Sequence, residues 1–101
     1  MKIRKARDVI AVLKKKGFFI GEGDGKPNHH TYYYLWIDGK KTAVYTYFSH
    51  KPGSDDLNNH IMKSIQKQLK FETDTNTAEK FFDCPFTKEN YAEMIKQKGL
   101  F

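Results

Sequence analysis

The N-terminal part of the chain changes from a helical to an extended pattern of apolar positions. Residues 5–16 carry apolar side chains at the spacing of one helix face, at Ala6, Val9, Ile10 and Leu13. Lysines occupy the last turn, where positive charge suits the helix dipole, and Gly17 then ends the predicted helix. The apolar segment 18–21 predicts a short strand. The segment 21–28 holds glycines and a proline and predicts a loop.

Two longer segments predict a β-hairpin. Residues 29–37 and 42–49 are rich in aromatic and β-branched side chains, and an Asp-Gly pair between them favours a tight turn. Side chains alternate between the two faces of a strand. One face therefore carries Thr31, Tyr33, Leu35 and Ile37, and the other carries His30, Tyr32, Tyr34 and Trp36. We expect the first face to meet the core, which leaves three large aromatic rings on the second.

The second half of the chain returns to helical spacing. Either Asp55 or Asp56 can cap a helix that runs to about Lys70. Its apolar stripe repeats every four residues, at Leu57, Ile61, Ile65 and Leu69. A short helix around residues 78–83 follows a polar, turn-prone stretch, and Thr87 can cap a last helix. This last helix packs inward and ends at a glycine; its inward side chains are Tyr91, Met94 and Ile95, and the glycine is Gly99.

These elements predict an α+β fold in the order α-β-β-β-α. The sheet has three antiparallel strands and carries two helices on one face, which is the architecture of double-stranded-RNA-binding domains. A length of 101 residues fits one compact unit. We expect residues 1–71 to form this domain and residues 72–101 to form a C-terminal helical extension that packs on it. An architecture does not by itself define a function.

Positive charge gathers at the N-terminal end of the chain. The net charge is +6, and residues 1–16 alone carry seven basic side chains and one acidic one. A basic surface attracts polyanions, of which RNA and DNA are the commonest. The candidate phosphate contacts are Lys14, Lys15, Lys16 and Lys26. A solvated helix face that only keeps the protein soluble is the alternative interpretation of this charge.

The sequence lacks the signals that direct a protein into or across a membrane. No apolar run approaches the ~18 residues of a membrane-spanning helix, and the N-terminus lacks the apolar centre of a signal peptide. The single cysteine, Cys84, cannot form an internal disulfide framework. These features predict a reduced, cytoplasmic protein that makes no contact with a membrane.

Four histidines are suited to acid–base chemistry near neutral pH. His29 and His30 lie at the start of a predicted strand, His50 follows the end of the next strand, and His60 lies in the second helix. An imidazole beside a ribose 2′-hydroxyl can remove its proton, so that the oxygen attacks the adjacent phosphate without any metal. Inert histidines at a strand edge are one alternative. A zinc site of His29, His50 and His60 is another, but this spacing matches no ligand pattern, so we expect neither metal nor cofactor.

The predicted face of Tyr32, Tyr34 and Trp36 has three interpretations. The C-terminal extension can fold over these rings, which would also give its own aromatic side chains a place to pack. A partner protein or a second copy of the chain can cover them, since exposed apolar patches mark interfaces. Bases of single-stranded RNA can stack on them. We favour cover by the extension.

Four segments resemble, in order, the HicA-type toxins, small basic proteins that form the toxin half of a toxin–antitoxin pair. Residues 5–18 look like that family's opening helix with its Gly-aromatic end. Residues 28–32, with the sequence NHHTY, are similar to its Gly-Ser-His-His-x-aromatic motif at the start of the second strand. Residues 42–57 look like the third strand and a loop with a histidine, and residues 60–71 look like the closing helix. The histidine pair is the specific part of this resemblance.

This resemblance implies a double-stranded-RNA-binding-like fold and a metal-independent ribonuclease that cuts messenger RNA. It also implies a HicB-like antitoxin as a protein partner. The family's catalytic histidine is the first of the pair and maps to His29, with His30 and His50 as alternates. Asn28 stands where the family motif has serine. A non-catalytic RNA-binding or protein-interaction module of the same fold is the alternative function.

Overall fold

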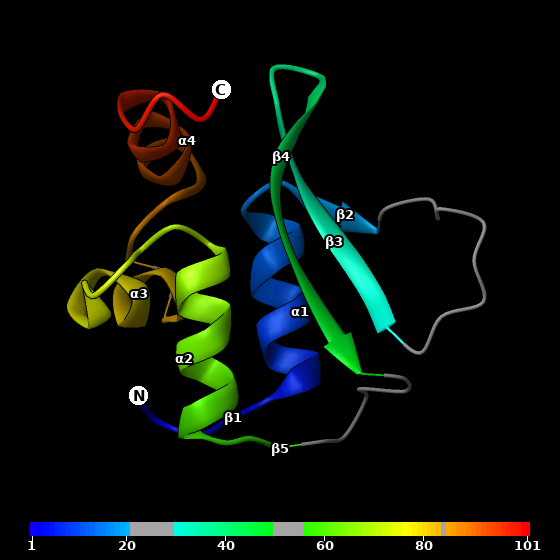
Figure 1. The fold of residues 1–101 in the computed structure, drawn as a ribbon, viewed down its shortest axis with the longest axis vertical. Coiled ribbons are helices and arrows are strands. Elements are labelled where there is room, and N and C mark those ends of the chain that lie inside the picture. Colours follow the sequence, from blue (N-terminus) through cyan, green and yellow to red (C-terminus); the bar gives the residue numbers. More distant parts are fainter. Residues whose placement is uncertain (21–29, 50–55, 84) are drawn as a thin grey trace.

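The computed structural model describes residues 1–20, 30–49, 56–83 and 85–101 (Figure 1). Within these ranges the chain forms a three-stranded sheet, a two-stranded sheet and four helices. The elements are β1 (Arg4–Lys5), α1 (Ala6–Lys15), β2 (Phe18–Ile20), β3 (His30–Ile37), β4 (Lys40–Ser49), β5 (Asp56–Leu57), α2 (Asn59–Gln68), α3 (Thr75–Phe82) and α4 (Lys88–Gln97). No helix within the described ranges combines the length and the apolar character that crossing a membrane requires.

The larger sheet has the strand order β2-β3-β4, and both strand pairs are antiparallel. Helix α1 contacts β2 and helix α2 contacts β4, so the two helices cover one face of the sheet (Figure 1). The predicted α+β class and the three antiparallel strands are therefore confirmed. The predicted helix-strand-strand-strand-helix order lacks the two short strands β1 and β5, which precede α1 and α2. The likeness to double-stranded-RNA-binding domains stays a prediction.

The alternation of side chains along β3 decides which sheet face meets the helices. Tyr33, Leu35 and Ile37 are buried, as the sequence predicts, and Val44 and Phe48 of β4 are buried beside them. The rings of Tyr33 and Phe48 meet edge to face, with centroids 5.7 Å apart. The opposite face of the sheet points away from the helices and carries the remaining aromatic rings of β3 and β4.

The predicted hairpin turn forms, but the strands that it joins are not fully regular. Both residues of the Asp-Gly turn have a positive φ, 52° and 77°, as a tight hairpin turn requires. Trp36 pairs with Lys41, whereas Tyr34 pairs with Tyr45, so β4 carries two more residues than β3 between these pairs. Within this bulge the Thr42 hydroxyl donates to a β3 carbonyl at 2.9 Å. Because the extra residues are even in number, Lys41 on one side of the bulge and Tyr45 on the other stay on the same face of the sheet.

The start of α2 differs from the prediction. The cap is Asn58, rather than Asp55 or Asp56, and its side-chain oxygen accepts from the Ile61 N–H at 2.9 Å. Asp56 belongs instead to β5, which pairs with β1. These two-residue strands are too short to leave an alternating pattern in the sequence. Asp55 lies outside the described residues.

The apolar stripe of α2 also differs from the prediction by one position. Met62, Ile65 and Leu69 are buried, whereas Ile61 is 39% exposed. The four-residue repeat started at Leu57, but Leu57 reaches the core from β5 rather than from the helix. Because the helix begins only at Asn59, its buried face does not continue the spacing from Leu57, and Met62 rather than Ile61 points to the core.

The C-terminal extension consists of α3 and α4. Helix α3 begins earlier than predicted because Asp74 caps it, accepting from the Thr77 N–H at 3.0 Å. Thr87 caps α4 as predicted and forms a capping box with Asn90. Gly99 follows the end of α4 with a φ of 72°, a conformation that favours glycine.

Aromatic rings join the extension to the rest of the molecule. The ring centroid of Tyr91 lies 5.7 Å from that of Phe18 and 5.0 Å from that of Phe81. The Phe71 and Phe81 centroids are 5.4 Å apart. The Tyr91 hydroxyl donates to the Leu69 carbonyl at 2.8 Å. The extension therefore shares one hydrophobic core with the preceding elements.

Candidate functional site

Two of the three predicted catalytic histidines fall outside the described part of the chain. His29 and His50 lie there, as does the predicted phosphate contact Lys26. The alternate, His30, is the first residue of β3, where it pairs with Ser49, the last residue of β4. In the sequence, His29 and His50 are the direct neighbours of this pair.

The fourth histidine, His60, is exposed in the first turn of α2. Among the described residues, no three histidine, cysteine, aspartate or glutamate side chains are grouped so that they could hold a metal ion. A role for His60 in a zinc site would depend on His29 and His50, which lie outside these residues.

The predicted lysine cluster divides into two environments. Lys14 and Lys15 are exposed in the last turn of α1. Lys16 is only 4% exposed, its ammonium donates to the Phe86 carbonyl, and it lies 5.5 Å from the Phe81 ring centroid. Lys16 does not share the surface of its neighbours, and its predicted contact with phosphate is not supported. The helical spacing of the apolar stripe could have revealed this, because Lys16 follows the buried Leu13 by three residues.

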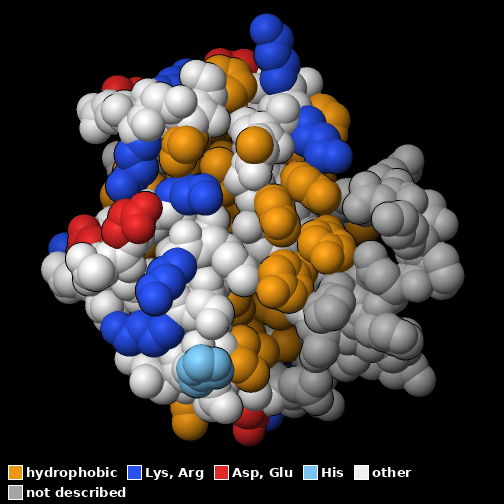
Figure 2. Space-filling view, in the orientation of Figure 1, with side chains coloured by type: hydrophobic (Ala, Val, Ile, Leu, Met, Phe, Trp, Pro, Cys, Tyr) orange, Lys and Arg blue, Asp and Glu red, His pale blue; other side chains and the backbone are white. Residues whose placement is uncertain are grey.

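Aromatic side chains line the sheet face that points away from the helices. We call this surface the outer aromatic face; its residues are Phe19, Tyr32, Tyr34, Trp36, Tyr45 and Tyr47. Strand pairing places Phe19, Tyr34 and Tyr45 in one row across three strands, and Tyr32 opposite Tyr47 in the next row. Figure 2 shows hydrophobic side chains gathered over β3 and β4.

The tyrosines of the outer aromatic face form a connected group of rings. The centroids of Tyr34 and Tyr45 are 5.3 Å apart, and those of Tyr32 and Tyr47 are 5.4 Å apart. Tyr32 and Tyr34 stack along β3 at 6.4 Å. These distances are typical of ring pairs that stabilise each other.

The C-terminal extension does not cover this face, contrary to the expectation from the sequence. Trp36, Tyr45 and Tyr47 are 37%, 40% and 39% exposed. Phe81, Phe82 and Tyr91 of the extension are instead buried with Phe18 and Phe71 on the helix side of the molecule. The extension thus finds a place for its aromatic side chains without using the outer aromatic face.

The outer aromatic face carries positive but no negative side chains on its strands. The described residues of β2, β3 and β4 include no aspartate or glutamate. The Lys41 ammonium lies 4.0 Å from the Tyr34 ring centroid, which is a favourable cation–π distance. Lys40, beside it at the hairpin, is exposed.

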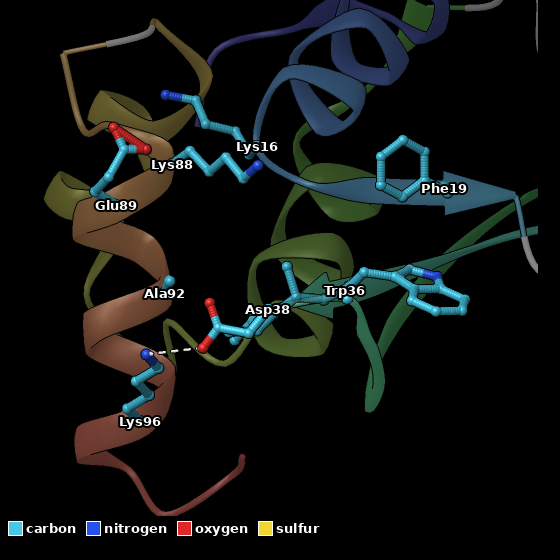
Figure 3. A pocket seen from close by; sticks show the side chains of 11 residues that line it. Lys16, Phe19, Trp36, Asp38, Lys88, Glu89, Ala92 and Lys96 are labelled. Carbon is cyan, nitrogen blue, oxygen red and sulfur yellow. Dashed lines mark ion pairs between the residues drawn. The ribbon is translucent and has the colours of Figure 1, made fainter.

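A cleft of about 700 Å³ opens at the hairpin end of this face, between β3 and α4. Figure 3 shows Phe19 and Trp36 on the sheet side of the cleft, across from α4 with Lys88 and Lys96. Lys96 is paired with Asp38 at 3.5 Å. Lys88 forms no ion pair within the described ranges of the chain.

Gly17 lies against three of the residues that line the cleft, Leu35, Trp36 and Lys88. Gly17 has a φ of 98°, and a Cβ at this position would lie 3.3 Å from the Trp36 carbonyl oxygen. The same Cβ would lie 3.4 Å from Cε of Lys88. A side chain at Gly17 would therefore crowd the Trp36 carbonyl and touch the Lys88 side chain, in addition to the strain of the positive φ.

No family model, curated protein or solved structure matches this chain. Its function is therefore argued from its own residues and geometry, together with the resemblance in the sequence.

The shifted pKa values among the described residues belong to groups away from the outer aromatic face. Burial raises the pKa of the Tyr33 and Tyr91 phenols. Hydrogen bonds from Thr77 lower the pKa of the Asp74 carboxyl, which caps α3. Burial of Asp83 acts to raise its pKa, but the hydrogen bonds and charges of Arg4 and Lys2 together outweigh this and lower it. These shifts follow from packing and capping.

Sequence reasoning missed half of the outer aromatic face. It named Tyr32, Tyr34 and Trp36 but not Phe19, Tyr45 or Tyr47. For Tyr45 and Tyr47 the missing signal was available in the hairpin, because a two-residue turn fixes which β4 positions share a face with which β3 positions. Phe19 lies on β2, and its place on the face depends on the pairing of β2 with β3. Lys88 gave no such signal, because its place in the cleft depends on how α4 packs in three dimensions.

Proposed function

We propose that this protein is a HicA-like RNA-binding protein that cleaves messenger RNA without a metal, with His29 as general acid or base. The observation that supports this most is the position of the histidine pair. Helix α1 and strands β2, β3 and β4 follow in the order that the resemblance implies, and β3 begins at His30, directly after His29. In the resembling family the pair likewise stands at the start of this strand.

The chemistry of such a site needs only one or two imidazoles. A neutral imidazole removes the proton of a ribose 2′-hydroxyl, and the oxygen attacks the adjacent phosphorus. The bond from phosphorus to the 5′-oxygen breaks, and that oxygen receives a proton from an acid. The products are a 2′,3′-cyclic phosphate and a free 5′-hydroxyl. His30 and His50 are the alternates for either role.

The exposed lysines would supply affinity for the RNA backbone. Lys14 and Lys15 lie on the surface at the end of α1, and Lys26 is the third candidate. Lysines neutralise phosphates without reading the base sequence. A HicB-like antitoxin would be the protein partner, and such a pair would act in the cytoplasm.

A cleavage assay tests the proposal. Purified protein is incubated with a labelled messenger RNA in excess chelator, beside the His29→Ala variant. We expect the wild type to cut the RNA and His29→Ala to be slower by about 100-fold or more, since general acid–base catalysis contributes at least this much. The RNA affinity and the unfolding temperature of the variant should not change.

The matched control is His60→Ala, because His60 is exposed on α2 and has no role in the proposed site. We expect this variant to cut RNA at the wild-type rate. Undiminished cleavage by His29→Ala would remove His29 from the mechanism, and the His30→Ala and His50→Ala variants would then identify the catalytic group. Intact RNA with folded wild-type protein would contradict the ribonuclease.

The exposure of the outer aromatic face favours a second candidate, a non-catalytic binding module of the same fold. Such a module would bind its partner tightly without cutting RNA. Trp36→Ala would then weaken the complex, whereas His29→Ala would not. The cleavage assay distinguishes the two candidates.

A further inference from the structure

The outer aromatic face exposes several large aromatic rings to solvent. Phe19 is 53% exposed on β2, and Trp36 and Tyr45 are more than one-third exposed on the neighbouring strands. The tyrosine rings contact each other on the side of the sheet that no described helix covers. A continuous exposed aromatic surface of this kind marks a binding site.

The charges around these rings indicate what would bind there. The described strands of the sheet have no acidic side chain, and Lys41 lies against the Tyr34 ring. Two acidic residues line the adjoining cleft between β3 and α4: Asp38 at the turn is paired with Lys96 of α4, and Glu89 lies on α4 next to Lys88. The complementary ligand therefore combines flat, apolar rings with negative charge, which is the chemistry of an unpaired nucleotide strand.

The α4 cleft adds a phosphate contact at the hairpin end of the same surface. Phe19 and Trp36 belong both to the outer aromatic face and to the cleft, so the two are continuous (Figure 3). Lys88 reaches into the cleft from α4 and has no ion-pair partner in the described segments. A volume of about 700 Å³ lies in the range of small-ligand pockets and can admit a nucleotide.

We propose that the outer aromatic face binds single-stranded RNA. Unpaired bases stack on Trp36 and Tyr45, and backbone phosphates lie against Lys41 and against Lys88 in the α4 cleft. The inference rests on the proposed function, which makes RNA the substrate, and it adds that the substrate is unpaired. Because β3 runs from His30 to the hairpin, a strand of RNA along it would extend from the first residue of β3 to the cleft between β3 and α4.

The same observations disfavour the other occupants of this surface. A second copy of the chain would use the same face in a symmetric dimer, and the described strands of that face offer no acidic side chain to pair with Lys41. A duplex RNA cannot stack its paired bases on exposed rings. A protein partner would need an acidic surface with apolar groups between the charges.

Binding is tested separately from cleavage with a 2′-O-methyl oligonucleotide. Methylation removes the 2′-hydroxyl nucleophile, so this RNA can be bound but not cut. A fluorescent single strand of about ten nucleotides is titrated with the full-length protein. We expect Tyr45→Ala to weaken its binding by about 5- to 100-fold, because each stacked base contributes on this order. Tyr45→Phe, which keeps the ring, should bind as the wild type does.

A second pair of variants tests the cleft. Lys88→Gln should weaken binding and reduce its salt dependence by about one phosphate contact. The matched control is Lys80→Gln, which removes the same charge from an exposed position on α3. We expect this control to retain most of the affinity. Thermal unfolding of each variant shows whether the fold is kept.

Several outcomes would overturn the inference. Unchanged affinity in both Tyr45→Ala and Trp36→Ala would remove the rings from the RNA site, while cleavage that depends on His29 would leave the proposed function standing. Equal affinity for the single strand and its duplex would exclude stacking. Loss of self-association or of antitoxin binding in Tyr45→Ala, with RNA affinity kept, would assign the face to a protein.

Discussion

Tyr91 is the residue at which the C-terminal extension is fixed to the rest of the core. Its ring is fully buried against Phe18 and Phe81, and its hydroxyl donates to the Leu69 carbonyl at the end of α2. Burial raises the pKa of this phenol because the charged form would lose its hydration. One side chain thus joins α4, α2 and the start of β2.

Tyr91→Phe should lower the free energy of unfolding by about 1 kcal/mol at neutral pH. The substitution keeps the ring but leaves the Leu69 carbonyl without this donor. Urea unfolding measures the loss. Tyr45→Phe is the control, because Tyr45 lies on the exposed face of the sheet. A loss no larger than that of the control would contradict the role of the buried hydroxyl.

The same phenol makes stability depend on alkaline pH. An unfolded tyrosine ionises near pH ~10, whereas the raised pKa keeps Tyr91 protonated in the folded chain. Its contribution is therefore fully present below this pH and falls as the pH rises above it. Tyr91→Phe should reduce this alkaline loss, and Tyr33, whose pKa is also raised, should account for part of what remains.

At the scale of the single residue, sequence patterns predicted the buried apolar residues correctly but did not predict the buried lysine. Leu35 and Ile37 were predicted to face the core because alternation alone requires it, and they do. Lys16 was predicted as a surface cation from its charge, although its helical position indicates burial. The ammonium of a lysine can donate to a carbonyl while its aliphatic stem packs in the core. Residue type alone therefore does not reveal whether a lysine is buried or exposed.

At the scale of the element, the sequence predicted those features that depend only on residues close together in the chain. The Asp-Gly turn and the Thr87 cap depend on residues a few positions apart, and both were predicted. The pairing of β1 with β5 joins segments about fifty residues apart and has no local pattern. Because Asp56 and Leu57 take part in this pairing, α2 begins at Asn59, later than the sequence predicts.

The end of α2 offers a substitution that should stabilise the protein. Lys70 has a φ of 73°, and the N–H groups of Lys70 and Phe71 donate to carbonyls in the last turn of the helix. A side chain at this left-handed position is unfavourable, whereas glycine adopts it freely. Lys70→Gly should therefore raise the free energy of unfolding by about 0.5–1 kcal/mol.

The matched control for this substitution lies three residues earlier. Lys67 is exposed within the last turn of α2, so Lys67→Gly removes the same side chain from a helical position. We expect this control to lose about 1 kcal/mol of stability. Urea unfolding of both variants gives the comparison. A loss of stability in Lys70→Gly would show that the lysine side chain contributes more than the backbone strain costs.

At the scale of the whole molecule, the sequence could not decide on which side the extension packs. Its aromatic side chains needed a buried place, and two surfaces could supply one. The rings of Phe18 and Phe71 on the helix side accept Phe81 and Tyr91, so the outer aromatic face stays uncovered. Which of the two surfaces the extension covers depends on how its shape fits each of them in three dimensions. The pattern of apolar residues within one segment does not contain that information.

Among the described residues, two surfaces are candidate contacts for RNA. One is the exposed lysine pair Lys14 and Lys15 at the end of α1, and the other is the outer aromatic face with Lys41 and Lys88. The lysines would give affinity that falls with salt, whereas base stacking resists salt. The salt dependence of binding therefore reports how many phosphates are neutralised.

RNA binding is tested most sharply by the affinity of the uncut complex between the His29→Ala variant and single-stranded RNA, measured at increasing salt. We expect binding at low salt. The logarithm of the binding constant should fall linearly with the logarithm of the salt concentration, with a slope of about −0.7 for each neutralised phosphate. Replacing Lys14 and Lys15 by glutamine should reduce that slope by about 1.4. Absence of binding at low salt by the folded protein would contradict an RNA-binding function.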